Sequence, residues 1–224
     1  MNTDLHSHAV SPDPSACGPA GTSIRHVLFD ADGVLQQTPG GSQLAAEPYL
    51  GERTSEFLSR VWEDELLTLA GQGDMLSLVA AAMADFGVTA PVDELYRAIW
   101  LRIEPAEEAV ALVRTLRRNG YGVHLGTNQE RNRATYMREV LGYDALFDTS
   151  CYSWELRARK PDTAFFVEAA RRIGAEPETI LFIDDSESNV AGARKSGFAA
   201  EQWTLADGHP SLLGIFRKHG VAVA

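Results

Sequence analysis

Residues 24–35 read IRHVLFDADGVL, an apolar run that stops at two aspartates and a glycine. A short apolar run bounded by turn residues is typical of a buried strand. The same construction recurs where residues 123–125 (VHL) lead to Gly-Thr-Asn at 126–128, and where residues 180–183 (ILFI) lead to two aspartates at 184–185. Each of these three predicted strands therefore ends at polar side chains.

Helical patterns lie between the strands. Residues 107–118 carry apolar side chains at helical spacing, a second helix is expected from Asp162 as N-cap to Gly174, and a third covers about residues 186–196 before Gly197. Glycine after the last apolar position is a common helix stop. Strands that alternate with helices pair in parallel through crossovers, so the pattern predicts an α/β fold with a doubly wound, Rossmann-like parallel sheet. Sites in such sheets form at the carboxyl ends of the strands.

Residues 36–104 differ from the rest, because they show three helical patterns and no convincing strand. The patterns begin near Phe57, Met75 and Leu95. We expect an all-helical cap at 36–104, inserted in an α/β core made of residues 23–35 and 105–224, where it lies over the strand ends as a lid. Residues 1–22 are rich in Ser, Pro, Gly and Ala and predict a disordered N-terminal tail.

Composition excludes several classes of protein. Apolar residues make up 45% of the 224 residues, enough for a sizeable core, and the formal net charge of -11 argues against a nucleic-acid partner. No apolar stretch reaches the roughly 18 residues of a membrane span. Cys17 and Cys151 lie in unlike contexts, so we expect no disulfide and a reducing, cytoplasmic compartment. Monomer and homodimer both remain open.

The polar ends of the strands suit phosphoryl transfer to a carboxylate. Repulsion between an anionic nucleophile and an anionic substrate would be offset by a divalent metal and a lysine. Mg²⁺ prefers oxygen ligands. The predicted ligands are the carboxylates of Asp30, Asp184 and Asp185, with the backbone carbonyl of Asp32.

Four groups of residues then resemble a known family. In chain order they are Asp30-Ala31-Asp32-Gly33-Val34-Leu35, Gly126-Thr127-Asn128, Lys160-Pro161-Asp162, and Ile183-Asp184-Asp185-Ser186 with Asn189. They are similar to the four motifs of the haloacid dehalogenase superfamily, and most similar to its phosphatase-type members with a small helical cap after the first motif. The resemblance covers residues 24 to about 203. Each residue alone would be ordinary in a turn or helix cap, but independent capping needs would not produce all four in this order.

The resemblance implies a Mg²⁺-dependent phosphatase of small phosphorylated metabolites that works through an aspartyl-phosphate. Asp30 would be the nucleophile and Asp32 the general acid and base. Thr127, assisted by Asn128, would bind the phosphoryl group, and Lys160 would neutralise charge. Asp185 and Asp184 would hold the metal, with Asn189 supporting their loop.

Other functions stay open at this point. A phosphomutase of the β-phosphoglucomutase type would share this architecture, and a regulatory phospho-acceptor domain would share the residue types. In such a domain the acidic pair comes early and the acceptor aspartate later, whereas the pair Asp184-Asp185 comes last here. A non-catalytic binding protein is also possible, although every expected catalytic residue type is present. The four tryptophans are expected to pack in cores. Gln36 is one of several polar cap residues that could reach a substrate, although a solvated surface position is favoured for most of them.

Overall fold

A computed structural model describes residues 23–223, so the predictions for the tail of residues 1–22, including Cys17, fall outside the described residues. The core contains one sheet of five parallel strands in the order β5-β4-β1-β6-β7. This is the predicted α/β arrangement. The strands are β1 (His26–Phe29), β4 (Gly122–Thr127), β5 (Thr149–Tyr152), β6 (Ile180–Asp184) and β7 (Ala199–Gln202).

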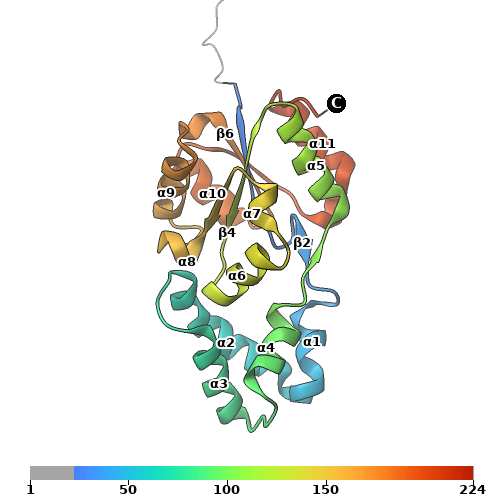
Figure 1. The fold of residues 1–224 in the computed structure, drawn as a ribbon, viewed down its shortest axis with the longest axis vertical. Coiled ribbons are helices and arrows are strands. Elements are labelled where there is room, and N and C mark those ends of the chain that lie inside the picture. The colour runs from blue at the N-terminus through green and yellow to red at the C-terminus, as the bar shows by residue number, and fades with distance from the viewer. Residues whose placement is uncertain (1–22, 224) are drawn as a thin grey trace, which may run out of the picture.

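The register of the central strands decides where their polar ends lie. Phe29, the last residue of β1, pairs with Leu125 of β4 on one side and with Ile183 of β6 on the other. The residues that follow these three positions therefore emerge together, at the end of the sheet that faces the cap (Figure 1).

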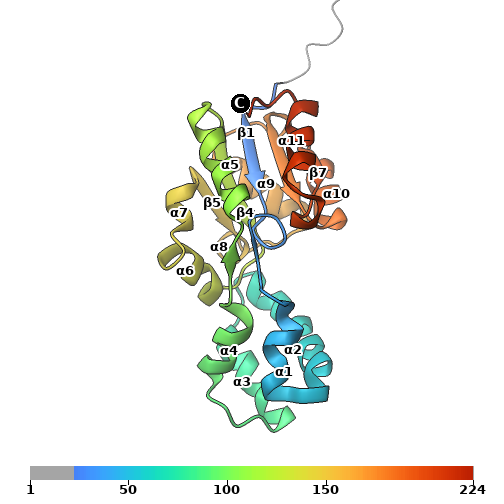
Figure 2. The ribbon, with the colours of Figure 1, turned by 90° about the vertical axis from the view of Figure 1, so that its right-hand side faces the viewer.

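Helices cover both faces of the sheet because side chains alternate along each strand. Val27 and Phe29 belong to the core cluster beneath α5 and α11, whereas Leu28 belongs to the cluster beneath α9 and α10. Figure 2 shows the two layers from the side. The helices of the core are α5 (Glu107–Arg118), α6 (Arg131–Glu139), α7 (Tyr143–Leu146), α8 (Ser153–Leu156), α9 (Thr163–Ile173), α10 (Glu187–Lys195) and α11 (His209–Lys218). Three 3₁₀ turns complete the described chain: Gly51–Arg53, Pro177–Thr179 and Leu205–Asp207.

The three helices predicted between the strands are confirmed. The first has the predicted bounds, and the second has Asp162 as its N-cap and ends at Gly174 in the left-handed conformation, at φ 74°. Serines at 186 and 196 cap the third. Cys151 is buried and free, and none of the helices in residues 23–223 is long and apolar enough to cross a bilayer.

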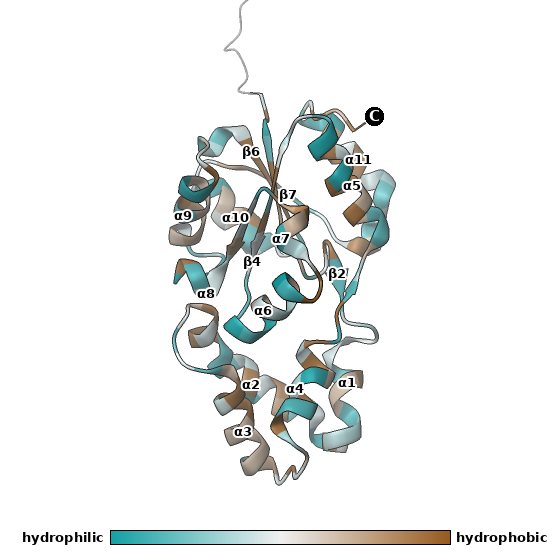
Figure 3. Ribbon diagram, viewed as in Figure 1, coloured by the Kyte–Doolittle hydropathy of each residue, from teal (hydrophilic) through white to brown (hydrophobic). Residues whose placement is uncertain are grey.

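The insertion after β1 is a helical cap with its own core. Its helices are α1 (Gly41–Leu50), α2 (Thr54–Leu69), α3 (Met75–Phe86) and α4 (Val92–Trp100). Phe57, Val61, Val79, Leu95 and Ile99 are among the side chains buried between them. In Figure 3 the largely apolar α3 stands out in brown.

The cap differs from the prediction in two ways. Helix α1 was not predicted, because it buries only Ala45 and Ala46 and contains Pro48, so it shows no strong apolar periodicity. The insertion is also not purely helical: β2 (Gln36–Gln37) pairs antiparallel with β3 (Glu104–Pro105) where the two connections run side by side. A strand of two residues is too short to show an alternation of apolar and polar side chains, so the sequence did not predict β2 and β3. The predicted domain boundaries fall within this ribbon and stay a prediction.

Candidate active site

Asp30 and Asp32 lie in a tight turn after β1. The backbone N–H of Asp30 donates to the carbonyl of Ile183, which extends the pairing with β6 by one residue. The carbonyl of Ala31 accepts from the backbone N–H groups of residues 34, 35 and 36, and the turn closes through Gly33 at φ 75°. A Cβ at Gly33 would overlap the carboxylate of Asp185. Glycine therefore lets this turn approach the end of β6 closely.

Lys160 joins the ends of β1 and β6. Its Nζ lies 2.7 Å from Asp30 Oδ1 and 2.7 Å from Asp184 Oδ2, and all three residues are buried. Asn128 fixes the backbone of Lys160 in both directions: Asn128 Nδ2 donates to the Lys160 carbonyl at 3.0 Å, and Lys160 N donates to Asn128 Oδ1 at 2.8 Å. A buried ammonium persists only where carboxylates pair with it, as they do here.

A carboxylate cluster beside Lys160 has the composition of a cation site. Oxygens of Asp30, Asp184 and Asp185 lie within 4.8 Å of one another. Asp184 is already engaged through both oxygens, because Oδ1 accepts from Ser186 N at 2.8 Å and from Asn189 Nδ2 at 3.0 Å while Oδ2 binds Lys160. Three carboxylates face one ammonium, so the cluster carries excess negative charge.

The electrostatics of the cluster follow from that excess. Burial raises the pKa of Asp30 to about 7 even though the Lys160 charge opposes the rise. Burial and the neighbouring Asp184 charge also raise the pKa of Asp185. Burial would lower the pKa of Lys160, but Asp30 and Asp184 outweigh it and raise that pKa. A divalent cation would relieve the repulsion between the carboxylates, and hard oxygen donors suit Mg²⁺.

Arg133 of α6 binds the carboxylate of Asp32 through two nitrogens. Nη1 lies 2.5 Å from Oδ2 and Nη2 lies 2.7 Å from Oδ1. Gln36 Nε2 donates to Oδ1 at 2.9 Å, and Gln129 Nε2 donates to Oδ2 at 2.7 Å. Burial alone would raise the pKa of Asp32, but the charge of Arg133 and these hydrogen bonds outweigh it and hold the pKa at about 2. Asp32 is therefore an ionised carboxylate here.

The same arginine also contacts the cap. Arg133 Nε donates to the carbonyl of Trp100, the last residue of α4, at 2.7 Å. One turn earlier on α4, the Tyr96 hydroxyl donates to Glu130, the N-cap of α6. The start of α6 therefore connects the end of the sheet to the cap.

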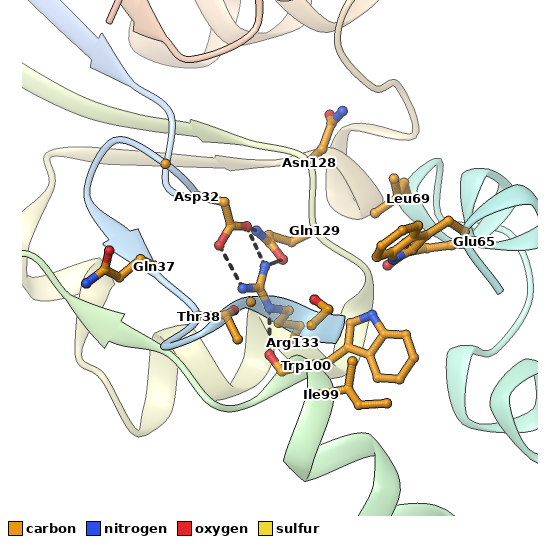
Figure 4. A pocket seen from close by; sticks show the side chains of 14 residues that line it. Asp32, Gln37, Thr38, Glu65, Leu69, Ile99, Trp100, Asn128, Gln129 and Arg133 are labelled. Atoms are coloured by element: carbon orange, nitrogen blue, oxygen red, sulfur yellow. Dashed lines mark hydrogen bonds and ion pairs between the residues drawn. The ribbon is translucent and has the colours of Figure 1, made fainter. Parts of the chain in front are cut away.

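A cavity of about 400 Å³ lies between the cap and the strand ends. Asp32, Asn128, Gln129 and Arg133 line it from the core. Figure 4 shows Glu65 and Leu69 of α2 on one side of this cavity, Gln37 on the other, and the Asp32–Arg133 pair between them. The cap contributes Gln37, Thr38, Gly41, Ser42, Trp62, Glu65, Leu69, Ile99 and Trp100.

A comparison with protein families identifies the fold and its chemistry class. The model of the haloacid dehalogenase-like hydrolase family matches residues 24–197, most of the described chain. The chain belongs to this family. The strand order, the helical insertion after the first strand and the cluster at the strand ends all agree with that membership.

Curated relatives of this haloacid dehalogenase-like hydrolase are phosphatase-type enzymes. It is 24% identical over 186 residues to the pyrophosphatase PpaX of Bacillus cereus (strain G9842), covering 81% of this chain and 85% of that protein. It is 27% identical over 179 residues to a bifunctional riboflavin kinase/FMN phosphatase of Arabidopsis thaliana, covering 76% of this chain and 46% of that protein.

Solved structures show the same fold. A predicted HAD-like family hydrolase from Porphyromonas gingivalis matches with a TM-score of 0.72 at 22% identity, over 87% of this chain and 97% of that one. The HAD family enzyme bt-2542 from Bacteroides thetaiotaomicron, in complex with magnesium and inorganic phosphate, matches with a TM-score of 0.71 at 19% identity, over 85% of this chain and 99% of that one. At these identities the likeness establishes the fold alone.

Most site residues predicted from sequence lie at the strand ends of this hydrolase, whereas Lys160 reaches them from the loop before α9 and Asn189 from the first turn of α10. Their surroundings were not all foreseen. Thr127 Oγ1 accepts a hydrogen bond from Gln129 Nε2 at 3.1 Å, and Asn128 holds the Lys160 loop. The roles assigned to Thr127 and Asn128 at the phosphoryl group, and to the Asp32 carbonyl at the metal, stay predictions.

Several residues of the haloacid dehalogenase-like site were missed or misjudged. Arg133 and Gln129 were not singled out, although both follow the second motif closely: Gln129 comes just before the N-cap of α6, and Arg133 lies in the first turn of that helix. Trp62 was expected to pack in a core, yet it is 46% exposed at the cavity. Gln36, one of the polar cap residues for which a surface position was favoured over a contact at the site, is buried against Asp32, because β2 turns it inward.

Proposed function

We propose that this hydrolase removes phosphate from small phosphorylated metabolites, with Asp30 as nucleophile and Asp32 as general acid and base. The supporting observation is the placement of Lys160 Nζ, 2.7 Å from both Asp30 and Asp184, at the edge of a three-carboxylate cluster. An ammonium held against the nucleophile offsets the repulsion that an approaching phosphoryl group would meet. The curated relatives named as phosphatases support the same reaction class.

The reaction would proceed in two displacements. First, an oxygen of Asp30 attacks phosphorus, the bond from phosphorus to the leaving oxygen breaks, and that oxygen takes a proton from Asp32. Second, Asp32 takes a proton from water, the water oxygen attacks phosphorus, and the bond to Asp30 breaks to release phosphate. One ester and one water thus become one alcohol and one phosphate.

The donor set fits Mg²⁺ as the cofactor of this proposal. Asp30 and Asp185 would supply carboxylate oxygens, and Asp184, already bound to Lys160, Ser186 and Asn189, would hold the arrangement in place. When bound, Mg²⁺ would neutralise charge on the phosphoryl oxygens and on Asp30. A cation bound at the cluster would lower the raised pKa of Asp30 and so favour the ionised nucleophile.

The pairing with Arg133 defines the resting state of Asp32. As an ionised carboxylate it is ready to accept the proton from water in the second displacement. The first displacement requires that Asp32 carry a proton, so the contact with Arg133 must weaken once an anionic substrate is bound. A phosphoryl group beside the guanidinium would compete with Asp32 for its charge.

Release of phosphate from 4-nitrophenyl phosphate, measured with Mg²⁺ and again after its removal by EDTA, tests the proposal. We expect turnover that depends on Mg²⁺ and returns when Mg²⁺ is restored. Product analysis with a hexose 1-phosphate separates a hydrolase from a mutase, because a hydrolase yields free sugar and phosphate. Isomerised hexose phosphate without free phosphate would overturn the hydrolase assignment.

A further inference from the structure

The cavity under the cap is where the leaving group of a substrate would lie. In an in-line displacement by Asp30 the leaving oxygen points away from the nucleophile, toward its acid Asp32. Asp32 lines the cavity, and the residues beyond it belong mainly to the cap. The chemical character of these residues therefore indicates which kind of leaving group the substrate carries on its phosphate.

The charges that line this cavity are unbalanced. Asp32 and Glu65 are acidic, and among the described residues that line it Arg133 is the one cation. Arg133 contacts Asp32 at 2.5 and 2.7 Å, so its charge serves Asp32 and any phosphoryl group that competes with Asp32 for it. The carboxylate of Glu65 consequently faces the cavity without a cation of its own there. A second anionic group on a substrate would meet this carboxylate.

Glu65 lies among the ionisable side chains of Arg133, Glu130 and Asp32. Burial raises its pKa to about 7, and the charges of Glu130 and Asp32 add to the rise while Arg133 opposes it. The side chain of Trp100 also opposes the rise. The carboxylate oxygens of Glu65 have lone pairs that can accept hydrogen bonds from the hydroxyl groups of a ligand.

The other walls of the cavity suit an uncharged polar ligand. Gln37, Thr38 and Ser42 offer neutral donors and acceptors, and the half-exposed Trp62 offers apolar ring surface. Carbon-bound hydrogens of a polyol pack against such rings while its hydroxyl groups bind carboxylate and amide oxygens.

We infer that Glu65 selects substrates whose leaving group is uncharged and bears several hydroxyl groups, as in sugar and polyol phosphates, and rejects leaving groups that are themselves anionic. Phosphorylated carboxylic acids and pyrophosphate belong to the rejected class. This inference rests on the proposed phosphatase function and adds the substrate class. It assigns to Glu65 a contact with the leaving group and no part in phosphoryl transfer itself.

The test compares kcat/KM for hexose phosphates and glycerol 3-phosphate with kcat/KM for phosphoglycolate and pyrophosphate, all with Mg²⁺. At pH 8, where Glu65 with its pKa of about 7 is mostly ionised, we expect the wild-type enzyme to favour the uncharged leaving groups by at least about 10-fold, because a buried carboxylate is repelled by a like charge. In Glu65→Gln the ratio between the two classes should fall by about 10-fold or more. Glu63→Gln, an exposed neighbour on α2, is the matched control and should keep the wild-type ratio.

The outcomes separate this inference from the function on which it rests. Hydrolysis of esters with a wild-type preference for anionic leaving groups would overturn the inference and leave the phosphatase assignment standing. An unchanged ratio in Glu65→Gln would do the same, even if both rates fell together, since an equal fall marks a merely structural role. Failure of the wild-type enzyme to release phosphate from any ester would overturn both.

Discussion

Arg133 and Asp32 lie 101 positions apart in the chain, and Arg133 holds both carboxylate oxygens of Asp32 at 2.5 and 2.7 Å. Gln36 and Gln129 supply two further donors to the same carboxylate. Arg133 in addition donates from Nε to the carbonyl of Trp100 in the cap. The orientation of the proposed acid and base is thus tied to the position of the cap.

Arg133→Gln is expected to lower kcat/KM for an alkyl phosphate by about 100-fold and for 4-nitrophenyl phosphate by less than about 10-fold. An alkoxide must be protonated as it leaves, so its departure depends on a well-oriented Asp32, whereas nitrophenolate leaves without that help. Arg133→Lys keeps the charge but loses the planar guanidinium group. Its kcat/KM for the alkyl phosphate should therefore lie between those of wild type and Arg133→Gln. Steady-state rates with both substrates measure the difference.

Arg131→Gln, on the exposed side of the same helix, is the control for Arg133 and should leave both rates near wild type. Equal losses with the two substrates would mean that Arg133 supports only the fold. A gain in activity would mean that the arginine restrains Asp32 rather than positioning it.

Asp30→Asn is expected to reduce Mg²⁺-dependent phosphate release by at least about 1,000-fold, because an amide oxygen cannot serve as the nucleophile. The folded state should survive. The pKa of Asp30 is raised, so its ionisation opposes folding as the pH rises from 3.8 through about 7, and an amide removes that cost. Melting temperatures at pH 8 without metal should therefore be no lower than for wild type. Activity close to that of Asp85→Asn, a surface control on α3, would rule Asp30 out as the nucleophile.

Asp185→Asn is expected to raise the Mg²⁺ concentration required for half-maximal activity by at least about 10-fold. It should also shrink the increase in melting temperature that Mg²⁺ gives the wild-type protein, because a cation that binds the folded state stabilises it in proportion to its affinity. Asp93→Asn removes an exposed carboxylate from the first turn of α4 and is the matched control. An unchanged response to Mg²⁺ in the melting curve would contradict a metal site at Asp185.

His124 should make the protein sensitive to acid. It is 3% exposed, its Nε2 lies 3.1 Å from Nδ1 of His26, and burial together with the His26 charge lowers its pKa from 6.5 to about 4. The folded state then binds fewer protons than the unfolded state, so the stability present above pH 6.5 is lost as the pH falls toward 4. This amounts to about 2 kcal/mol of unfolding free energy at pH 5.

Urea unfolding of His124→Leu at pH 7.5 and pH 5 checks this expectation, and the variant should lose less stability between the two than wild type. His209→Leu, at the partly exposed start of α11, controls for the loss of an imidazole. Identical pH dependence in wild type and His124→Leu would place the acid sensitivity elsewhere.

Much of the core could be predicted because its signals are local. The apolar run of β1, the two aspartates after it and the glycine that ends α9 act over a few residues, and strand–helix alternation leaves few topologies open. Helix α1 was not predicted, because little in its own sequence indicates a helix. It buries only two alanines and holds a proline, and it is stabilised by its packing on α2 and α4 rather than by its own periodicity.

By itself, the sequence determined the parallel sheet and the convergence of Asp30, Thr127 and Asp184, because parallel strands must end at one edge. Lys160 follows no strand, and the resemblance of the four motifs placed it at the site. Only the tertiary structure decided that Arg133 pairs with Asp32 and that Glu65 enters the cavity. A side chain on an inserted cap carries no sequence signal for the distant group it will face. Its partner follows from the docking of two separate cores, which is a property of the folded chain as a whole.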